Sequence, residues 1–252
     1  NNNIKYPDKA LSVARLSKNF AGFTAVDAIS FEVNQGEIFG FLGANGAGKT
    51  TAMRMLCGLS MPTSGSATVA GFDVYTQTES IKKNIGYMSQ KFSLYEDLTV
   101  RENMQFYGGI YGMTNAFIKE KTIQVLRQLH LEDKANLLVS SLPLGWKQKL
   151  AFAVAVFHEP RIVFLDEPTV GVDVHSRQAI ISYLKSLNQK GTTLIYTSHQ
   201  LSEAEGLCET IAMIDAGKIL VHDSLNKLLD EHKEDGLEGL FISLTGKSIR
   251  NE

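Results

Sequence analysis

The chain has 252 residues, of which 44% are hydrophobic, so it can bury a substantial core as one large domain or as one domain with a sub-domain. Its formal charge of −2 gives no general attraction to nucleic acid or to an anionic membrane surface. The two cysteines, Cys57 and Cys208, are far apart and lack metal-ligand spacing, which fits a reducing compartment better than a disulfide scaffold.

Two features of the sequence bear on membranes and processing. The longest uninterrupted apolar run is AFAVAVF at 151–157, far below the roughly 20 residues that a spanning helix needs. The sequence begins NNNIKYPDK, with neither an initiator Met nor the apolar region of a signal peptide. We therefore expect an excised piece of a longer polypeptide, with a processed N-terminus as the alternative.

The first part of the chain is predicted to form strands and one helix. Residues 11–16 and 29–33 alternate between apolar and polar side chains, and residues 37–43 form a short apolar run that ends in glycine. Helical spacing follows over 50–59 and stops at Gly58, as expected for a glycine at a helix C-terminus.

A helical block separates this part from a second set of strands. After a hairpin or edge strand at 65–74, apolar residues three and four apart predict helices from about 96 to 138. The later elements are a charged helical tail, a helix at 174–187, and strands at 161–168, 192–198, 211–215 and 216–220. Strands that alternate with helices indicate an α/β core, here with an inserted helical block.

Residues 43–50 match the phosphate-loop pattern G-x-x-x-x-G-K-[ST] without a gap. Its glycines let backbone N–H groups turn inward around phosphate oxygens, Lys49 adds a positive charge, and the Thr50 hydroxyl can ligate Mg²⁺. The helix that begins at Thr50 directs its positive end at the same anion. A chance glycine turn is the alternative, but the pattern lies between a predicted buried strand and a predicted helix, the context that it requires. We therefore predict a nucleotide site formed by Gly43, Ala44, Asn45, Gly46, Ala47, Gly48, Lys49, Thr50 and Thr51.

Two adjacent acids end the apolar strand within 162–168. A buried strand delivers Asp166 at its C-terminal edge, where the carboxylate can hold Mg²⁺ directly or through water. Glu167 can polarise the water that attacks the γ-phosphate. Solvated acids that cap a strand are the alternative, but the phosphate loop in the same chain favours the catalytic interpretation.

The motifs GANGAGKTT, YMSQ, IVFLDEP, VGVD and TSHQ, in this order, resemble those of the nucleotide-binding subunit of an ABC transporter. The resemblance extends from about residue 11 to residue 246. It implies an α/β fold: a P-loop NTPase (RecA-like) core with an N-terminal antiparallel β sub-domain and an inserted helical sub-domain. We expect the ATPase domain at 9–228, with its helical sub-domain at about 92–157, and a C-terminal tail at 229–252.

The resemblance also implies roles for further residues. Gln90 matches the Q-loop glutamine, which ligates Mg²⁺ and senses the γ-phosphate, and Asp173 matches the D-loop aspartate, which communicates across a dimer interface. His199 matches the switch histidine that contacts the γ-phosphate. Phe20 lies where the family places an aromatic residue that stacks on adenine, and Phe23 is a nearby competitor. Outside this ordered set of motifs, such residues would be ordinary loop, surface or core residues.

The stretch SLPLGWKQKL departs from the family pattern. The family has the signature LSGGQ and then a basic helix at this position, and Leu142, Pro143, Leu144, Gly145 and Trp146 stand where the pentapeptide belongs. Pro143 has no hydroxyl and no N–H, and Leu144 adds bulk where the backbone should approach the γ-phosphate of ATP on the opposite subunit. Either this is a signature loop that has lost its serine, or it is a variant that still works through Gly145 and the helix dipole.

The segments 99–112 and 237–249 resemble the ATPases of bacterial export systems for drugs or lipids, although 237–249 would also suit an ordinary docked helix–strand. This branch implies ATP and Mg²⁺ as cofactors, and a transmembrane permease subunit as a partner. It also implies a second ABC cassette, in a hetero or tandem pair or in a homodimer. The expected location is cytoplasmic, peripheral on the inner face of the cell membrane.

Two other classes are alternatives to an exporter ATPase. A soluble ABC ATPase acting on ribosomes or nucleic acid usually has a charged linker or long coiled coils, and neither these nor a basic stripe occurs in the sequence, so we expect no nucleic-acid partner. A non-hydrolysing regulatory cassette is disfavoured because Lys49, Asp166, Glu167 and His199 are all present.

Overall fold

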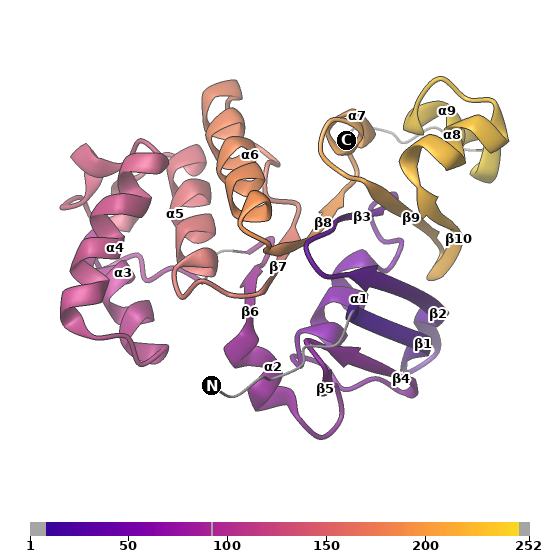
Figure 1. Cartoon of the computed structure of the whole chain (residues 1–252), viewed down its shortest axis with the longest axis horizontal. Coiled ribbons are helices and arrows are strands. Elements are labelled where there is room, and N and C mark those ends of the chain that lie inside the picture. Colours follow the sequence, from indigo (N-terminus) through magenta and orange to yellow (C-terminus); the bar gives the residue numbers. More distant parts are fainter. Residues whose placement is uncertain (1–8, 92, 247–252) are drawn as a thin grey trace.

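The predicted strands and helices occur in the expected order along the chain (Figure 1), and the structure adds α2, β6 and α7, whose bounds follow. The computed structural model describes residues 9–91 and 93–246. The strands are β1 (Lys9–Phe20), β2 (Phe23–Asn34), β3 (Ile38–Leu42), β4 (Ser64–Val69), β5 (Phe72–Asp73), β6 (Ile85–Met88), β7 (Ile162–Asp166), β8 (Thr193–Ser198), β9 (Thr210–Asp215) and β10 (Lys218–Ser224). The α-helices are α1 (Lys49–Leu56), α2 (Thr78–Asn84), α3 (Val100–Ile110), α4 (Asn115–Gln128), α5 (Leu144–Val156), α6 (Val174–Gln189), α7 (Leu201–Glu205), α8 (Leu225–His232) and α9 (Leu237–Thr245).

These strands form two sheets of different kinds. The antiparallel sheet has the order β2-β1-β4-β5 and belongs to the N-terminal part of the chain. The other sheet has the order β10-β9-β3-β8-β7-β6, in which the pairs from β9 to β6 are parallel and β10 pairs antiparallel with β9. The carboxyl ends of the parallel strands meet at one edge of this sheet, where ligands bind in open α/β sheets.

Alternate side chains of the central strands divide the apolar residues into two cores. In β3, Phe39 and Phe41 lie in the core that contains the antiparallel sheet and α1, whereas Ile38 and Leu42 lie in the core that contains α3 to α9. Strand β7 alternates in the same way. Because both faces are covered, these parallel strands appear in the sequence as continuous apolar runs.

Helices α3, α4 and α5 form the predicted inserted block, on the left of Figure 1. Its first helix begins with a capping box, in which the Thr99 side chain accepts from the Glu102 N–H and the Glu102 carboxylate accepts from the Thr99 N–H. The helices lie within the expected 92–157, although Phe92 itself is outside the described residues.

The C-terminal tail is attached to the core by its own apolar residues. Helix α8 runs across the predicted boundary at residue 228, and Leu228 is buried in the same core as Leu237, Leu240 and Phe241 of α9. The predicted tail extends to residue 252, and residues 247–252 are outside the described part. None of the helices in the described ranges has the length and apolarity to cross a membrane.

Candidate nucleotide-binding site

The phosphate loop joins the end of β3 to the start of α1, as predicted. Gly48 caps α1 at φ 107°, in the left-handed region that favours glycine, and a Cβ there would lie 2.5 Å from the carbonyl oxygen of Ala25. A Cβ on Gly43 would lie 2.2 Å from the carbonyl oxygen of Ile214. Both ends of the loop are therefore wedged against backbone of β2 and β9, where only glycine fits.

Lys49 extends back over the loop from the first turn of α1. Its Nζ donates to the carbonyl oxygens of Gly43 (2.7 Å) and Ala44 (3.0 Å), and lies 3.6 Å from Glu167 Oε1. Burial lowers the pKa of this ammonium, while the neighbouring Glu167 and Asp166 carboxylates oppose the shift. The positive charge is thus held between the loop and the end of β7.

Asp166 ends β7 beside the phosphate loop, almost fully buried. Its Oδ1 accepts from the Thr197 hydroxyl (2.8 Å), and its buried Oδ2 has no hydrogen-bond partner among the described residues. Burial raises the pKa of this carboxyl, while the neighbouring Thr197 and Thr50 hydroxyls oppose the shift. A buried oxygen without a partner next to a threonine hydroxyl fits Mg²⁺, which is usually held by one or two carboxylates and by substrate phosphates.

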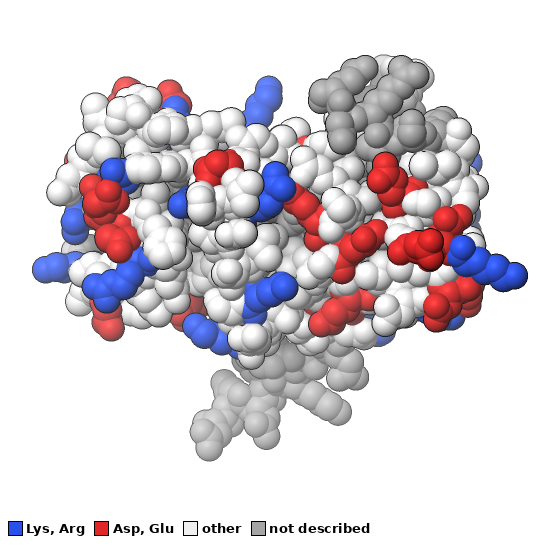
Figure 2. Space-filling model, turned by 90° about the horizontal axis from the view of Figure 1, so that it is seen from above, with Lys and Arg blue, Asp and Glu red and all other residues white. Residues whose placement is uncertain are grey.

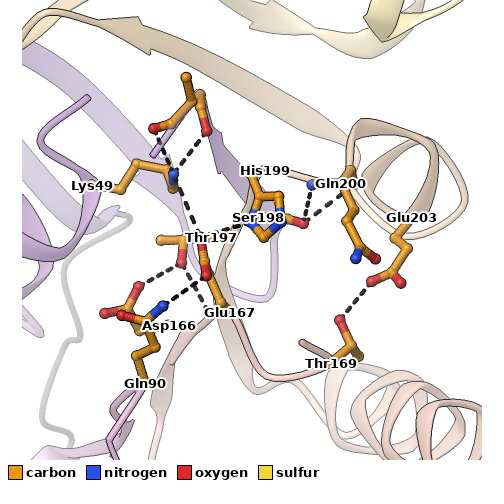
Figure 3. A network of polar contacts seen from close by, with 12 residues as sticks. Lys49, Gln90, Asp166, Glu167, Thr169, Thr197, Ser198, His199, Gln200 and Glu203 are labelled. Carbon is orange, nitrogen blue, oxygen red and sulfur yellow. Dashed lines mark hydrogen bonds and ion pairs between the residues drawn. The ribbon is translucent and has the colours of Figure 1, made fainter. Parts of the chain in front are cut away.

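Glu167 is the centre of the polar cluster (Figure 3). Its Oε1 lies 3.0 Å from His199 Nδ1, and its Oε2 accepts from Gln90 Nε2 at 3.1 Å. With Lys49, the structure therefore brings together four residues that the sequence places far apart. The Glu167 backbone has φ 53°, which is uncommon for a residue with a side chain and is often found at functional sites.

A cleft of about 390 Å³ lies over the phosphate loop. Apart from loop residues, its lining includes Gln90, Glu167 and, on β2, Phe23 and Ala25. Phe20 is not among the lining residues; its ring lies 5.2 Å from Lys18 Nζ. Both phenylalanines are more than half exposed, but the structure places Phe23, the competitor in the sequence, at the cleft.

The altered signature stretch starts α5. Pro143 is the exposed N-cap residue and Leu144 is 51% exposed, whereas Gly145 is buried. Trp146 packs partly buried against the helical core, with Lys134 Nζ 4.4 Å from its ring centroid. The side chains that replace the family residues therefore divide into two exposed ones and one that faces its own sub-domain.

Asp173 forms the N-cap of α6, next to this stretch. Its Oδ1 accepts from the Ser176 N–H (2.9 Å) and its Oδ2 from the Ser176 hydroxyl (2.7 Å). These hydrogen bonds lower the pKa of Asp173 to about 2. A Cβ on Gly145 would lie 2.9 Å from Asp173 Oδ2, so the first turn of α5 packs closely on the start of α6.

Sequence reasoning missed two residues that hold the end of β7 and the segment after it. Thr197, in β8, also accepts from the Glu167 N–H (3.1 Å), and Gln148, in α5, donates to the Pro168 carbonyl oxygen (2.8 Å). Each comes from an element other than β7, and no local pattern marks either one.

This fold and this cleft define an ATP-binding domain of the P-loop NTPase class. The chain belongs to the ABC transporter family, whose model matches residues 26–170. It is an ATP-binding domain of that family, whose ATP-binding domains hydrolyse ATP. The expectations of fold, family and ATPase activity are confirmed.

The chain is similar to several named proteins. It is 40% identical to "Probable multidrug ABC transporter ATP-binding protein YbhF" of Escherichia coli (strain K12), over 94% of this chain and 42% of that protein. It is 39% identical to "Linearmycin resistance ATP-binding protein LnrL" of Bacillus subtilis (strain 168), over 92% of this chain and 75% of that protein. A solved structure, "Structure of ATP binding subunit of ABC transporter", has a TM-score of 0.87 at 26% identity and covers 94% of this chain and 99% of that one. The chain thus spans less than half the length of YbhF.

Proposed function

We propose that this chain binds MgATP on residues 43–51, hydrolyses it with Glu167, and couples hydrolysis to export across a membrane. The observation that carries this proposal is the contact of one buried carboxylate with Lys49, Gln90 and His199 beside the phosphate loop. A carboxylate in this position can orient a water for in-line attack on the γ-phosphate.

The other residues divide the remaining tasks. Lys49 and the loop N–H groups would hold the β- and γ-phosphates, and Thr50, Asp166 and Gln90 would hold Mg²⁺, which would neutralise charge on the phosphate oxygens. His199 Nδ1 contacts Oε1 of Glu167, the same oxygen that lies near Lys49 Nζ. This contact would keep the His199 ring beside the γ-phosphate of a bound ATP. Phe23 supplies an aromatic face for adenine at the β2 side of the cleft.

The test is the Glu167→Gln variant, which keeps the shape of the side chain and removes its charge. We expect ATP binding by calorimetry to persist while turnover stops, because the amide is a poor base. Glu79→Gln, on the exposed Glu79–Lys82 pair, is the matched control and should hydrolyse like the parent. Equal hydrolysis by Glu167→Gln and the parent would remove Glu167 from this role.

Export is supported by the names of the relatives and by one exposed surface. YbhF and LnrL are named for multidrug transport and linearmycin resistance. Next to the Q-loop, exposed Tyr95 and Phe106 have ring centroids 4.6 Å apart, an apolar surface suited to a short helix of a transmembrane permease subunit. This contact would place the chain on the cytoplasmic face of the membrane. Cross-linking from Tyr95 should capture a membrane protein, and capture of ribosomal proteins alone would contradict the proposal.

Charge gives no support to a nucleic-acid partner. The formal charge is −2, and Figure 2 shows lysine, arginine and acidic side chains interspersed over the face drawn, with acidic ones gathered on the side of the C-terminal helices. Phosphate-backbone binding depends on clustered Lys and Arg.

We infer further that the chain works in an asymmetric pair with a second ABC cassette. A signature loop without its serine loses one hydrogen bond to a charged oxygen, about 1.5–3 kcal/mol, or about tenfold to a hundredfold. A partner cassette with an intact signature loop would instead contact the ATP bound beside the complete Glu167 cluster of this chain. Pro143→Ser with Leu144→Gly, both exposed, should strengthen ATP-driven homodimers of the Glu167→Gln form, whereas Leu137→Ala, at another exposed leucine, should not. Tight homodimers without the restored residues would instead show a working variant loop.

A further inference from the structure

A third, largely buried carboxylate lies next to Asp166 and Glu167, outside the residues that line the cleft. Glu203, on α7, is 11% exposed at its side chain. Its Oε2 accepts from the Thr169 hydroxyl (2.6 Å) and from the Tyr196 hydroxyl (2.9 Å), and its Oε1 lies 3.0 Å from Arg177 Nη1. Figure 3 shows the Thr169–Glu203 bond beside the cluster around Glu167.

Each partner of Glu203 belongs to a segment that carries a site residue. Thr169 follows Glu167 by two residues, and Arg177 follows Asp173 by four, in the first turn of α6. Tyr196 precedes His199 by three residues, and Glu203 itself follows His199 by four. One carboxylate therefore ties together the segments of the catalytic glutamate, the D-loop aspartate and the switch histidine.

The backbone at Glu167 explains why such a tie is needed. Its φ of 53° lies in the left-handed region, which a residue with a side chain keeps only where surrounding contacts over-determine it. The Glu167 N–H donates to the Thr197 hydroxyl, and the carbonyl oxygen of the following residue, Pro168, accepts from the Gln148 side chain. The Thr169 hydroxyl, held by Glu203, is the next fixed point along the chain.

We propose that Glu203 is a positioning residue for ATP hydrolysis, which fixes the segment after Glu167 through the Thr169 hydroxyl so that the Glu167 carboxylate and the His199 ring stay in contact. Glu203 acts through Thr169 and touches no substrate. This proposal rests on the proposed role of Glu167. Because Arg177 holds the other oxygen of the same carboxylate, a shift of α6 would also move Thr169.

The test compares variants of Thr169 and Glu203 in the complete protein, under conditions in which the parent hydrolyses ATP. Thr169→Val keeps the shape and removes the hydroxyl, and Thr169→Ser keeps the hydroxyl. Misplacing a catalytic group by about 1 Å can cost on the order of a hundredfold in rate. We therefore expect kcat to fall about tenfold to a hundredfold in Thr169→Val and in Glu203→Ala, with KM for ATP unchanged within about twofold. Thr169→Ser should stay within about twofold of the parent.

Two further variants separate positioning from stability. Glu205→Gln is the matched control on α7, because this exposed carboxylate accepts from the Leu237 N–H of α9 and has no bond to the catalytic segments in the described structure. It should leave kcat unchanged. The double variant Glu203→Ala with Thr169→Val should be no slower than Glu203→Ala alone, since the Thr169–Glu203 contact is already lost in that single variant.

Three outcomes would overturn the proposal. One is a parental kcat in Thr169→Val, which does not depend on whether Glu203→Ala folds. Another is an equally slow Thr169→Ser, and the third is a double variant in which the two losses multiply. Glu167→Gln in the same assay separates the two proposals: if it is inactive while Thr169→Val is fully active, the role of Glu203 alone is wrong. If it is fully active, the role of Glu167 is wrong.

Discussion

We predict that the Thr197 hydroxyl contributes substantially to the free energy of unfolding, although nothing in the sequence of β8 marks this residue. It donates to Asp166 Oδ1 at 2.8 Å and accepts from the Glu167 N–H at 3.1 Å, in a fully buried position. In Thr197→Val the shape is kept and both contacts are lost. A hydrogen bond to a charged group contributes about 1.5–3 kcal/mol, and an unsatisfied buried N–H costs about 1–3 kcal/mol. Because the two are not independent, we expect the free energy of unfolding to fall by about 3 kcal/mol.

The same strand provides the control. Thr193 is also fully buried, and among the described residues its Oγ1 accepts only from the N–H of partly buried Gly36, so Thr193→Val should cost about 1 kcal/mol. Urea unfolding of both variants and of Thr197→Ser gives the comparison, with Thr197→Ser close to the parent. Equal losses in Thr197→Val and Thr193→Val would refute the reasoning, because the carboxylate contact would then add nothing.

Two further predictions concern nucleotide stacking and pH. Phe23→Ala should weaken ATP binding by about 1–3 kcal/mol, the range for stacking of a base on an aromatic ring, whereas Phe20→Ala should leave it unchanged; calorimetry that gives the reverse order would restore Phe20. Burial lowers the pKa of His158 to about 4, against the hydrogen bond with the Ile85 carbonyl oxygen. Since the unfolded chain then binds more protons, stability should fall by about 2–3 kcal/mol as the pH falls from about 6.5 to about 4. His158→Gln should flatten this part of the profile of unfolding free energy against pH, and an unchanged slope would contradict the assignment.

Local sequence patterns were enough to predict the parts of the site that lie on single elements. The glycine spacing before Lys49 and the apolar run before Asp166 each specify a strand end and a loop. These residues come together because the parallel strands that precede them end at the same sheet edge. The order of the predicted elements and the presence of the inserted helices could also be predicted, because each of these elements has its own pattern of apolar residues.

Contacts between distant elements could not be predicted in this way. The choice between Phe20 and Phe23 depends on how the β1–β2 turn faces the phosphate loop, and both residues flank the same Ala-Gly turn. The bonds of Thr197 and Glu203 join strands and helices that are far apart in sequence. The left-handed backbone of Glu167 likewise depends on contacts from three elements, because an isolated chain would avoid it.

Contacts between different elements also explain why the signature stretch has one glycine, Gly145, of the pair found in LSGGQ. A Cβ on Gly145 would lie 2.9 Å from Asp173 Oδ2 and 3.2 Å from Ser176 Oγ. These two oxygens are joined by a hydrogen bond in the N-cap of α6. They cannot give way without loosening the cap, so packing within this chain is sufficient reason for the glycine, whatever it does for a bound phosphate. Pro143 and Leu144 expose their side chains, so their replacement changes the surface offered to a partner. Packing of α5 on α6 can therefore persist while the contact with the opposite ATP is lost, as an asymmetric pair requires.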